Sequence, residues 1–408
     1  MTKQSSPLSS SVPLSPHPKR PSRSTFLPFA TPHVTEAEIN EVVDTLRSPW
    51  LSTGPKTKRF EREFAEAVGA TYSVAVSSAT AAMHLALKTL DIGPGDEIIV
   101  PVYTFTATAA VVVHCGARPV FVDVDPSTCN LDPARLQAAL SPRTRAIIAV
   151  HVAGLPAEMD AILAIAGAHG IPVIEDAAHA FPAKYRDQMI GTISDMTAFS
   201  FYATKPLATG DGGMLTTNNA DYAARVGILA LHGISRDAWK RYSAEGSWFY
   251  EVLEPGYKYN MTDLAASLGL HQLARRGWLL ERRRAIAARY TAEFSQFPEL
   301  EPPPNPPHVE HAWHLYALRL RAERLSIDRD ACIAALTEAR IGTSVHFIPL
   351  HLHPYYRAAY QLAPNDFPAA LDAYQREISL PLYPGMTEDD VEDVIAAIVD
   401  IVTTHRKR

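Results

Sequence analysis

FSFYATKPLATGDGG, residues Phe199 to Gly213, places a lysine and a glycine-rich turn directly after a run of buried, β-prone residues. Apolar and β-prone residues run up to Thr204 in the pattern of a buried strand, and a lysine with a glycine-rich turn follows. A lysine at a strand end usually extends its amine into solvent. A partly desolvated amine instead has a lowered pKa and can form a Schiff base with a carbonyl cofactor. One residue leaves both interpretations of Lys205 open.

Alternating strands and helices surround this stretch. The sequence predicts helices at residues 36–46, 57–67, 79–90 and 160–170. It predicts buried strands at residues 72–78, 96–101, 118–125, 144–154, 171–178, 195–205 and 212–218. Such alternation is typical of an α/β fold with a mostly parallel sheet that is covered on both faces.

The pattern changes after about Thr262. A long arginine-rich helix is predicted at 264–294, and a proline-rich loop at 298–313 excludes helix or central strand there. A strand at 314–322 and helices at 328–341 and 388–403 complete a smaller α+β unit. We therefore expect a disordered tail at 1–24, a large domain at 25–268 and a small C-terminal domain at 269–408.

Composition narrows the classes of partner. The chain has 408 residues, of which 47% are hydrophobic and 20% charged, as is ordinary for a soluble globular protein. Its 44 acidic and 38 basic residues are dispersed, which disfavours nucleic acid as a partner, and no apolar run is long enough to span a membrane. Three cysteines without a CxxC pair favour a reducing compartment, so we expect a cytoplasmic protein.

Ligands of parallel α/β sheets bind at the carboxyl ends of the strands, where two further features lie. Residues 77–80, Ser-Ser-Ala-Thr, begin a helix and are either an ordinary cap or an anion site. Asp176 ends a buried strand and is either ion-paired or capped, or it faces the protonated pyridine nitrogen of pyridoxal 5'-phosphate (PLP). Its distance from Lys205 along the chain, 205 − 176 = 29 residues, allows one connection and one further strand between them.

Five motifs, taken in order, give a family resemblance. SSATAAMHLAL, IEDAAHA, FSFYATKPLATGDGG, PGYKYNMTDL and SLPLYPGMT resemble the DegT/DnrJ/EryC1/StrS family of PLP-dependent nucleotide-sugar aminotransferases. The resemblance extends from Leu27 to the C-terminus. It implies an aspartate-aminotransferase-like fold (PLP fold type I) whose large domain binds PLP, and a homodimer with shared active sites.

The resemblance also implies roles for residues near the cofactor ring. Lys205 matches the lysine that holds PLP as an internal aldimine and later moves the proton between substrate and cofactor. Asp176 matches the carboxylate at the pyridine nitrogen, and His179 the histidine near the phenolic oxygen. Phe105 matches the aromatic residue that stacks on the ring.

Other matches concern the phosphate and the substrate. Ser200, with Ala79 and Thr80, matches the phosphate cup. Asn260 matches a residue that reaches the phosphate of the neighbouring subunit, and His346 a small-domain residue close to the substrate.

The expected reaction is transamination of a nucleotide-linked keto-sugar, with glutamate as amino donor and pyridoxamine phosphate in the second half-reaction. The motifs DAAHA, HGISRDAW, PGYKYN and HAWH look most like members that aminate carbon 4 of UDP-linked 4-keto sugars for surface polysaccharide or glycan biosynthesis. Amination at carbon 3, a dTDP- or GDP-linked sugar, and a non-catalytic PLP-binding regulator are the alternatives.

Two local departures and one competing site complete the sequence picture. Many family members have the sequence TKNLTTGEGG where this chain has TKPLATGDGG, so Pro206 and Asp211 alter the turn after the lysine without removing it. Dehydrating relatives carry histidine at that position, so Lys205 favours transamination. A zinc site is a further possibility for five histidines, His311, His314, His346, His351 and His353. It is disfavoured because no Cys or paired carboxylate lies at ligand spacing, and because surface or substrate-pocket positions explain these histidines equally well.

Overall fold

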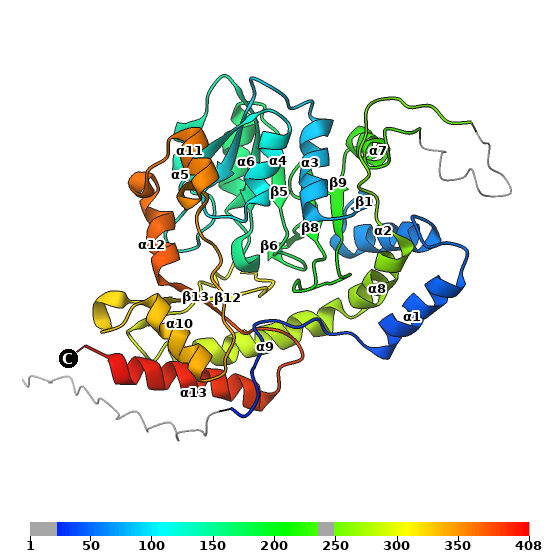
Figure 1. The fold of residues 1–408 in the computed structure, drawn as a ribbon. Helices are drawn as coiled ribbons and strands as arrows, with labels where there is room; N and C mark the ends of the chain where they lie inside the picture. The colour runs from blue at the N-terminus through cyan, green and yellow to red at the C-terminus, as the bar shows by residue number, and fades with distance from the viewer. Residues whose placement is uncertain (1–22, 236–248, 408) are drawn as a thin grey trace, which may run out of the picture.

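The computed structural model describes residues 23–235 and 249–407, and its centre is a seven-stranded sheet (Figure 1). Its strands are β1 (Tyr72–Val76), β2 (Glu97–Pro101), β3 (Arg118–Val122), β4 (Thr144–Val150), β5 (Val173–Asp176), β8 (Met196–Ser200) and β9 (Gly213–Thr217). Their order across the sheet is β1-β9-β8-β5-β4-β2-β3. β9 is antiparallel to both neighbours, and the other pairs are parallel. The predicted mostly parallel α/β sheet is confirmed.

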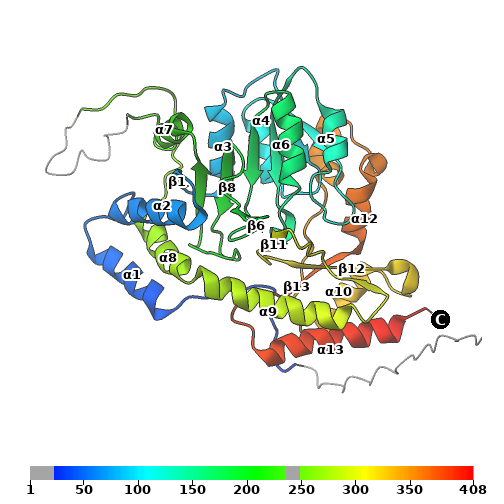
Figure 2. The same cartoon turned by 180° about the vertical axis from the view of Figure 1, so that it is seen from behind.

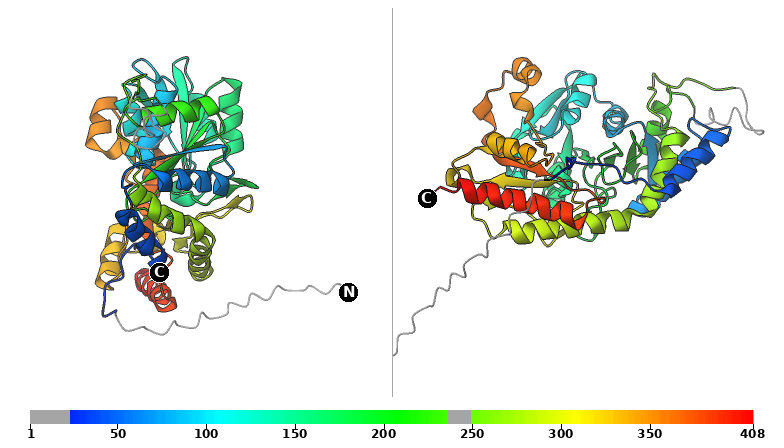
Figure 3. Two further views of the ribbon diagram at one scale, coloured as in Figure 1. Left: turned by 90° about the vertical axis from the view of Figure 1, so that its right-hand side faces the viewer. Right: turned by 60° about the horizontal axis from the view of Figure 1, so that its bottom comes forward.

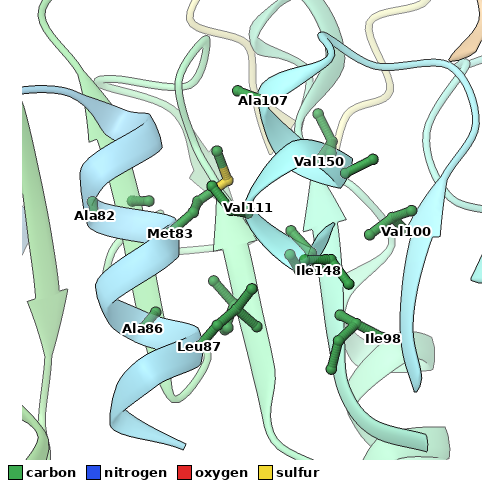
Figure 4. Packing of buried hydrophobic residues seen from close by; sticks show 14 of the residues in the cluster. Ala82, Met83, Ala86, Leu87, Ile98, Val100, Ala107, Val111, Ile148 and Val150 are labelled. Carbon is green, nitrogen blue, oxygen red and sulfur yellow. The ribbon is translucent and has the colours of Figure 1, made fainter. Parts of the chain in front are cut away.

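One face of the sheet is covered by helices from both halves of the chain. They are α3 (Ala79–Thr89), α4 (Ala107–His114), α7 (Ala220–Leu229), α11 (Pro354–Tyr360) and α12 (Pro368–Arg376). Successive strand side chains point to opposite faces, so Ile98 and Val100 of β2 pack here while Ile99 packs on the other face. Figure 4 shows Met83 of α3 and Val111 of α4 packed close to this face.

The opposite face packs against a second set of helices, of which α5 and α6 stand in front in Figure 2. These helices are α2 (Pro55–Val68), α5 (Pro133–Ala139), α6 (Met159–Ala168) and α8 (Asp263–Ala274). Phe64 of α2 is fully buried, and its ring lies 5.0 Å from that of Phe199 on β8 and 5.4 Å from that of Phe201. This aromatic packing anchors the chain on the way to Lys205.

The C-terminal part has its own antiparallel sheet, in the order β10-β12-β13. Its elements are β10 (Leu300–Glu301), β12 (Tyr316–Leu320), β13 (Glu377–Leu380), α9 (Arg276–Phe294), α10 (Arg329–Glu338) and α13 (Glu388–His405). α9 and α13 lie side by side along one edge of the molecule (Figure 3). Their buried residues form one apolar cluster with β12 and β13, which Leu27 joins from the N-terminal side.

The domain boundary at 268/269 stays a prediction, and two packing details bear on it. The backbone N–H of Leu27 donates to the carbonyl of Arg340 at 2.9 Å, and the carbonyl of Leu27 accepts from the N–H of Gly342 at 2.8 Å, so this N-terminal residue is tied to the small domain. Tyr356 of α11 and Ala370 of α12 instead pack with the large sheet. Chain order therefore does not separate the two cores cleanly.

The long helix predicted at 264–294 is wrong as one helix, because α8 and α9 are separated at Arg275. Arg275 has φ −96° and ψ 7°, and its guanidinium binds the carboxylate of Glu38 and the carbonyl of His33 at 3.1 Å. The apolar pattern continues across the break, so periodicity alone gives no sign of it.

The remaining elements are short. α1 (Glu36–Arg47) precedes α2, and a small three-stranded sheet lies in the order β11-β6-β7. Its strands are β6 (Lys184–Tyr185), β7 (Gln188–Met189) and β11 (Val309–Glu310), and single 3-10 turns occupy Val152–Gly154, Ala322–Arg324, Leu350–Leu352 and Pro364–Asp366. The predicted tail at 1–24 lies almost wholly outside the described residues. Among the described helices, none combines the length and the apolar character that crossing a membrane requires.

Candidate active site

Lys205 lies in a turn beyond the end of β8, so the predicted strand up to Thr204 is wrong. The strand ends at Ser200, and the backbone N–H of Lys205 donates to the carbonyl of Tyr202 at 2.9 Å. Phe201 remains buried but bonds to the loop, donating to Gly212 and accepting from Thr209, both at 2.8 Å. The apolar pattern therefore continues after the sheet pairing has stopped.

The amine of Lys205 is largely removed from water and lies among ionisable side chains. Burial lowers the pKa of Lys205 to about 8, and the negative charge of Asp176 acts in the opposite direction. Its Nζ lies 3.4 Å from Nε2 of His314. At pH 7 about a tenth of the amine is therefore in the neutral form that attacks a carbonyl, far more than for an ordinary lysine.

Asp176 is the last residue of β5 and is only 5% exposed. Oδ2 accepts a hydrogen bond from Thr108 Oγ1 at 2.8 Å, and Oδ1 accepts one from the backbone N–H of Ala178 at 3.2 Å. Burial raises the pKa of Asp176, while these donors and the charge of Lys205 lower it. The carboxylate thus has room for one further cationic donor.

Two histidines approach the lysine with unpaired nitrogens. The rings of His179 and His314 are 4.4 Å apart, and His179 also stacks on Phe347 at 5.5 Å. Burial, followed by the charge of Lys205, holds the pKa of both imidazoles well below the usual range. Within the described part of the chain, Nδ1 of each ring is buried without a hydrogen-bond partner, which is rare unless a ligand supplies one.

The predicted phosphate cup lies at the start of α3. Ser78 caps this helix by accepting from the backbone N–H of Ala81 at 3.0 Å, which leaves the N–H groups of Ala79 and Thr80 outside that bond. Gly213 pairs with both Val76 and Ser200, so Ser200 lies across β9 from the helix start. A Cβ at Gly213 would come within 2.4 Å of the Ser78 carbonyl carbon, so a glycine is needed for this close approach.

Phe105 and His346 border the same region. Phe105 is 59% exposed, and its ring lies 6.3 Å from Phe347, which links it to His179. His346 stacks on Phe29 at 5.5 Å. Burial lowers the pKa of His346 to about 4, with a smaller effect from the charge of Lys205.

Asn260 lies next to the predicted phosphate cup of its own chain. It bridges to Val76, its Nδ2 donates to Thr53 Oγ1 at 2.6 Å, and its Oδ1 accepts from Lys258 Nζ at 2.5 Å. It therefore lies beside the start of α3 of its own chain. Its contact with a neighbouring subunit stays a prediction.

Side chains that the sequence did not single out complete the site. Thr108 binds Asp176, and Phe347 lies between Phe105 and His179. His314, which the sequence left open as a surface, substrate-pocket or metal-binding histidine, faces the lysine. No three His, Cys, Asp or Glu side chains of the described residues are grouped as a metal site. The position of Thr108, early in the helix that follows β2, is the sequence signal that could have predicted its place in the site.

These groups fit PLP. The neutral amine of Lys205 matches the aldehyde, the buried carboxylate of Asp176 matches the ring nitrogen, and the start of α3 matches the phosphate. The unpaired Nδ1 of His179 matches a polar substituent of the ring. Fold and site together define the class of α/β enzymes that hold PLP on a lysine.

Comparison with known proteins gives the particular family. The model of the DegT/DnrJ/EryC1/StrS aminotransferase family matches residues 32–399. The spore coat polysaccharide biosynthesis protein SpsC of Bacillus subtilis is 54% identical over 381 residues, which are 93% of this chain and 98% of SpsC. The chain therefore belongs to the DegT/DnrJ/EryC1/StrS aminotransferase family.

Solved structures agree with the fold. Spr1654 of Streptococcus pneumoniae, assigned as a sugar aminotransferase and determined in its PMP form, matches with a TM-score of 0.87 and 37% identity over 93% of this chain and 99% of that one. DesV of S. venezuelae, in complex with a ketimine intermediate, matches with a TM-score of 0.80 and 33% identity over 89% and 93%. The predicted aminotransferase fold is confirmed.

Proposed function

We propose that the chain is a sugar aminotransferase that uses PLP to aminate carbon 4 of a UDP-linked 4-keto sugar, with glutamate as amino donor. The observation that carries this proposal is the buried amine of Lys205 beside the buried carboxylate of Asp176, in a chain of this family. The likeness to SpsC, named for spore coat polysaccharide biosynthesis, supports a role in surface polysaccharide or glycan synthesis.

Bound PLP supplies a carbonyl that accepts the amino group and a ring that accepts the electrons of the carbanion. The neutral Nζ of Lys205 would hold the cofactor at that carbonyl carbon, whose oxygen leaves as water, and once the amino donor has displaced it, Nζ would move the proton at the substrate carbon. Asp176 keeps a proton on the ring nitrogen by offering a buried negative charge. His179 donates or accepts at the phenolic oxygen through its unpaired nitrogen.

The phosphate and the ring face are held by the remaining residues. The N–H groups at the start of α3, with the hydroxyl of Ser200, bind the phosphate, and Phe105 covers the ring with its exposed face. Asn260 completes the phosphate site of a neighbouring subunit in a cytoplasmic homodimer. His346 lies beside the substrate.

The substrate assignment is tested with purified holoenzyme and matched pairs of keto-sugars. UDP-4-keto and UDP-3-keto sugars, and the dTDP- and GDP-linked 4-keto sugars, are each incubated with glutamate labelled with ¹⁵N. We expect the label in a 4-amino UDP-sugar, with kcat/KM at least about tenfold above that for the other sugars, a difference that one mismatched polar contact in a pocket produces.

The contrary results are equally specific. A 3-amino product, or faster turnover of a dTDP- or GDP-linked sugar, would contradict the assignment of carbon 4 or of UDP. Label transfer to no sugar, with a bound cofactor still present, would favour the regulator. Lys205→Ala is the matched control, because it removes the amine, together with the side chain beyond Cβ, at a position outside the sheet.

A further inference from the structure

His346 is tied to a buried acid through one hydroxyl group. Its Nδ1 lies 2.8 Å from Oγ of Ser379, and that Oγ lies 2.5 Å from Oε1 of Glu377. The backbone N–H of His346 donates to the other oxygen, Oε2, at 2.9 Å. Glu377 and Ser379 are two residues apart on β13 and therefore point to the same side of the strand.

The loop that carries His346 is fixed against β13. Ser344 and Ser379 exchange backbone hydrogen bonds of 3.1 and 2.8 Å, and the hydroxyl of Tyr103 donates to the carbonyl of His346 at 2.8 Å. Glu377 is 2% exposed and Ser379 is fully buried. Within the described residues Nε2 of His346 has no hydrogen-bond partner, so the network holds the ring by its other nitrogen.

The serine hydroxyl has one proton, so it cannot donate to both neighbours at once. When Glu377 is ionised, Ser379 donates to Oε1 and must accept from Nδ1–H of His346, which leaves Nε2 as an acceptor. When Glu377 is protonated, the proton sits on Oε1, because Oε2 already accepts from a backbone N–H. Ser379 then accepts from Oε1 and donates to Nδ1, so the proton of the imidazole lies on Nε2.

We propose that Glu377 and Ser379 are positioning residues that decide which nitrogen of His346 carries the proton, and so whether Nε2 donates to or accepts from an oxygen of the substrate. This inference rests on the proposed function for the placement of His346 beside a sugar. The hydrogen-bonded series of Glu377, Ser379 and His346, called the relay below, is a property of the protein alone.

The burial and the charges around Glu377 and His346 place the change of the His346 tautomer within a measurable pH range. Burial raises the pKa of Glu377 to about 8, and burial keeps the imidazole of His346 neutral by lowering its pKa to about 4. The groups that face Glu377 from the neighbouring elements are Arg319, Arg329, Tyr103 and Cys129, and those that face His346 are Lys205, His179 and His314. Below about pH 8 Nε2 is thus a donor, and above it an acceptor.

The test is the ¹⁵N spectrum of the histidine rings in holoenzyme labelled at histidine, recorded from roughly pH 6 to roughly pH 9.5, a range over which each ring nitrogen reports its protonation. A His346→Gln variant assigns the signal. We expect the wild-type protein to exchange Nε2–H for Nδ1–H near pH 8. Glu377→Gln keeps its oxygen on the backbone N–H and donates from its amide to Ser379, so we expect Nε2–H throughout the range.

Ser379→Ala provides the second variant, because it breaks the relay without changing the acid. In that variant we expect the tautomer of His346 to be the same across the whole pH range. Ser326→Ala is the matched control, since Ser326 also contacts a histidine, His405, at 3.4 Å but lies far from the site in an exposed position. It should leave the signal of His346 unchanged.

Two results would overturn the relay. One is a single tautomer of His346 in the wild-type protein across the whole range, and the other is identical behaviour of wild type and Glu377→Gln. For the substrate contact, we expect the KM for the keto-sugar to change several-fold between roughly pH 7 and roughly pH 9 in the wild type and to stay constant in Glu377→Gln. Because the ring spectra need no sugar, failure of sugar turnover with the tautomer exchange intact would contradict only the proposed function.

Discussion

At the scale of single residues, opposing effects meet at Lys205. Burial favours the neutral amine, and the carboxylate of Asp176 favours the ammonium ion. The amine must be neutral to bind a carbonyl, yet the carboxylate must stay charged to hold a proton on the ring nitrogen. With a pKa of about 8, about a tenth of the Lys205 amine is neutral at pH 7, far more than for an ordinary lysine.

The pH dependence of cofactor capture tests this balance. Because only the neutral amine reacts, the rate at which the apo-protein takes up PLP should rise with pH and level off above about 8. Asp176→Asn removes the charge that favours the ammonium form, so the midpoint should fall by roughly one pH unit or more. Stopped-flow absorbance follows the uptake at each pH.

Asp195→Asn is the control for that series. Its carboxylate accepts from the backbone N–H of Val173, at the opposite end of the strand that Asp176 ends, with a distance of 2.8 Å. It should leave the midpoint in place. A midpoint that stays or rises in Asp176→Asn would show that this carboxylate does not act on Lys205.

Residue chemistry was the easiest part to predict from the sequence. Lys205, Asp176 and His179 were expected together from their motifs, and in the structure the charge of Lys205 acts on the pKa of both Asp176 and His179. The contribution of Phe347 was not predictable, and His314 was expected only as one of several surface or substrate-pocket histidines, because both contacts arise only when the C-terminal segment folds over the sheet.

At the scale of elements, the close approach of β9 to the start of α3 is the feature on which the anion site depends. Gly213 permits it, since an added Cβ would lie 2.4 Å from the Ser78 carbonyl carbon and 2.6 Å from the Ala79 nitrogen. Both contacts are backbone atoms, which cannot rotate away as a side chain can.

Gly213→Ala should therefore move the helix start and weaken cofactor binding. We expect the Kd for PLP to rise by about tenfold to a hundredfold, the equivalent of the cost of overpacking one site. Titration of the apo-protein with PLP by absorbance measures it, and circular dichroism checks that the fold is retained.

Gly227→Ala is the matched control, because no atom lies within 4 Å of its added Cβ on α7. Replacing a glycine inside a helix should raise the free energy of unfolding by about 0.5–1 kcal/mol and leave PLP binding alone. Equal Kd values for the two variants would contradict the role given to the β9 and α3 contact.

Elements were predicted better than their ends. The strands that build the large sheet were expected in the correct order along the chain, but β8 was extended past Ser200 because Phe201 continues the buried pattern without pairing. The break between α8 and α9 at Arg275 was not predicted, because the contact that accompanies it, with Glu38, is tertiary and leaves no mark on the local apolar pattern. Patterns report burial, and backbone pairing is a separate property.

At the scale of the whole molecule, the position of Asn260 leads to a prediction about assembly. Asn260 lies beside the start of α3, where the phosphate cup is predicted. If it completes the site of a neighbouring subunit, each dimer has two sites that draw residues from both chains.

Mixing two inactive variants tests shared sites. Lys205→Ala lacks the amine, and Asn260→Asp places a negative charge near the phosphate of the partner's site. In a heterodimer one site carries both changes and the other carries neither, so random mixing after subunit exchange should restore about a quarter of the wild-type activity. If Asn260 acts within its own chain, the mixture stays inactive, which would contradict shared sites.

The central claim is that Lys205 holds the cofactor, and one measurement tests it directly. The holoenzyme is reduced with borohydride, which fixes the cofactor on the amine that binds it, and the digested peptides are analysed by mass spectrometry. We predict the reduced adduct on Lys205, its absence from Lys205→Ala, and its loss when glutamate is added before reduction. An adduct on another lysine, or one that persists in Lys205→Ala, would contradict the account.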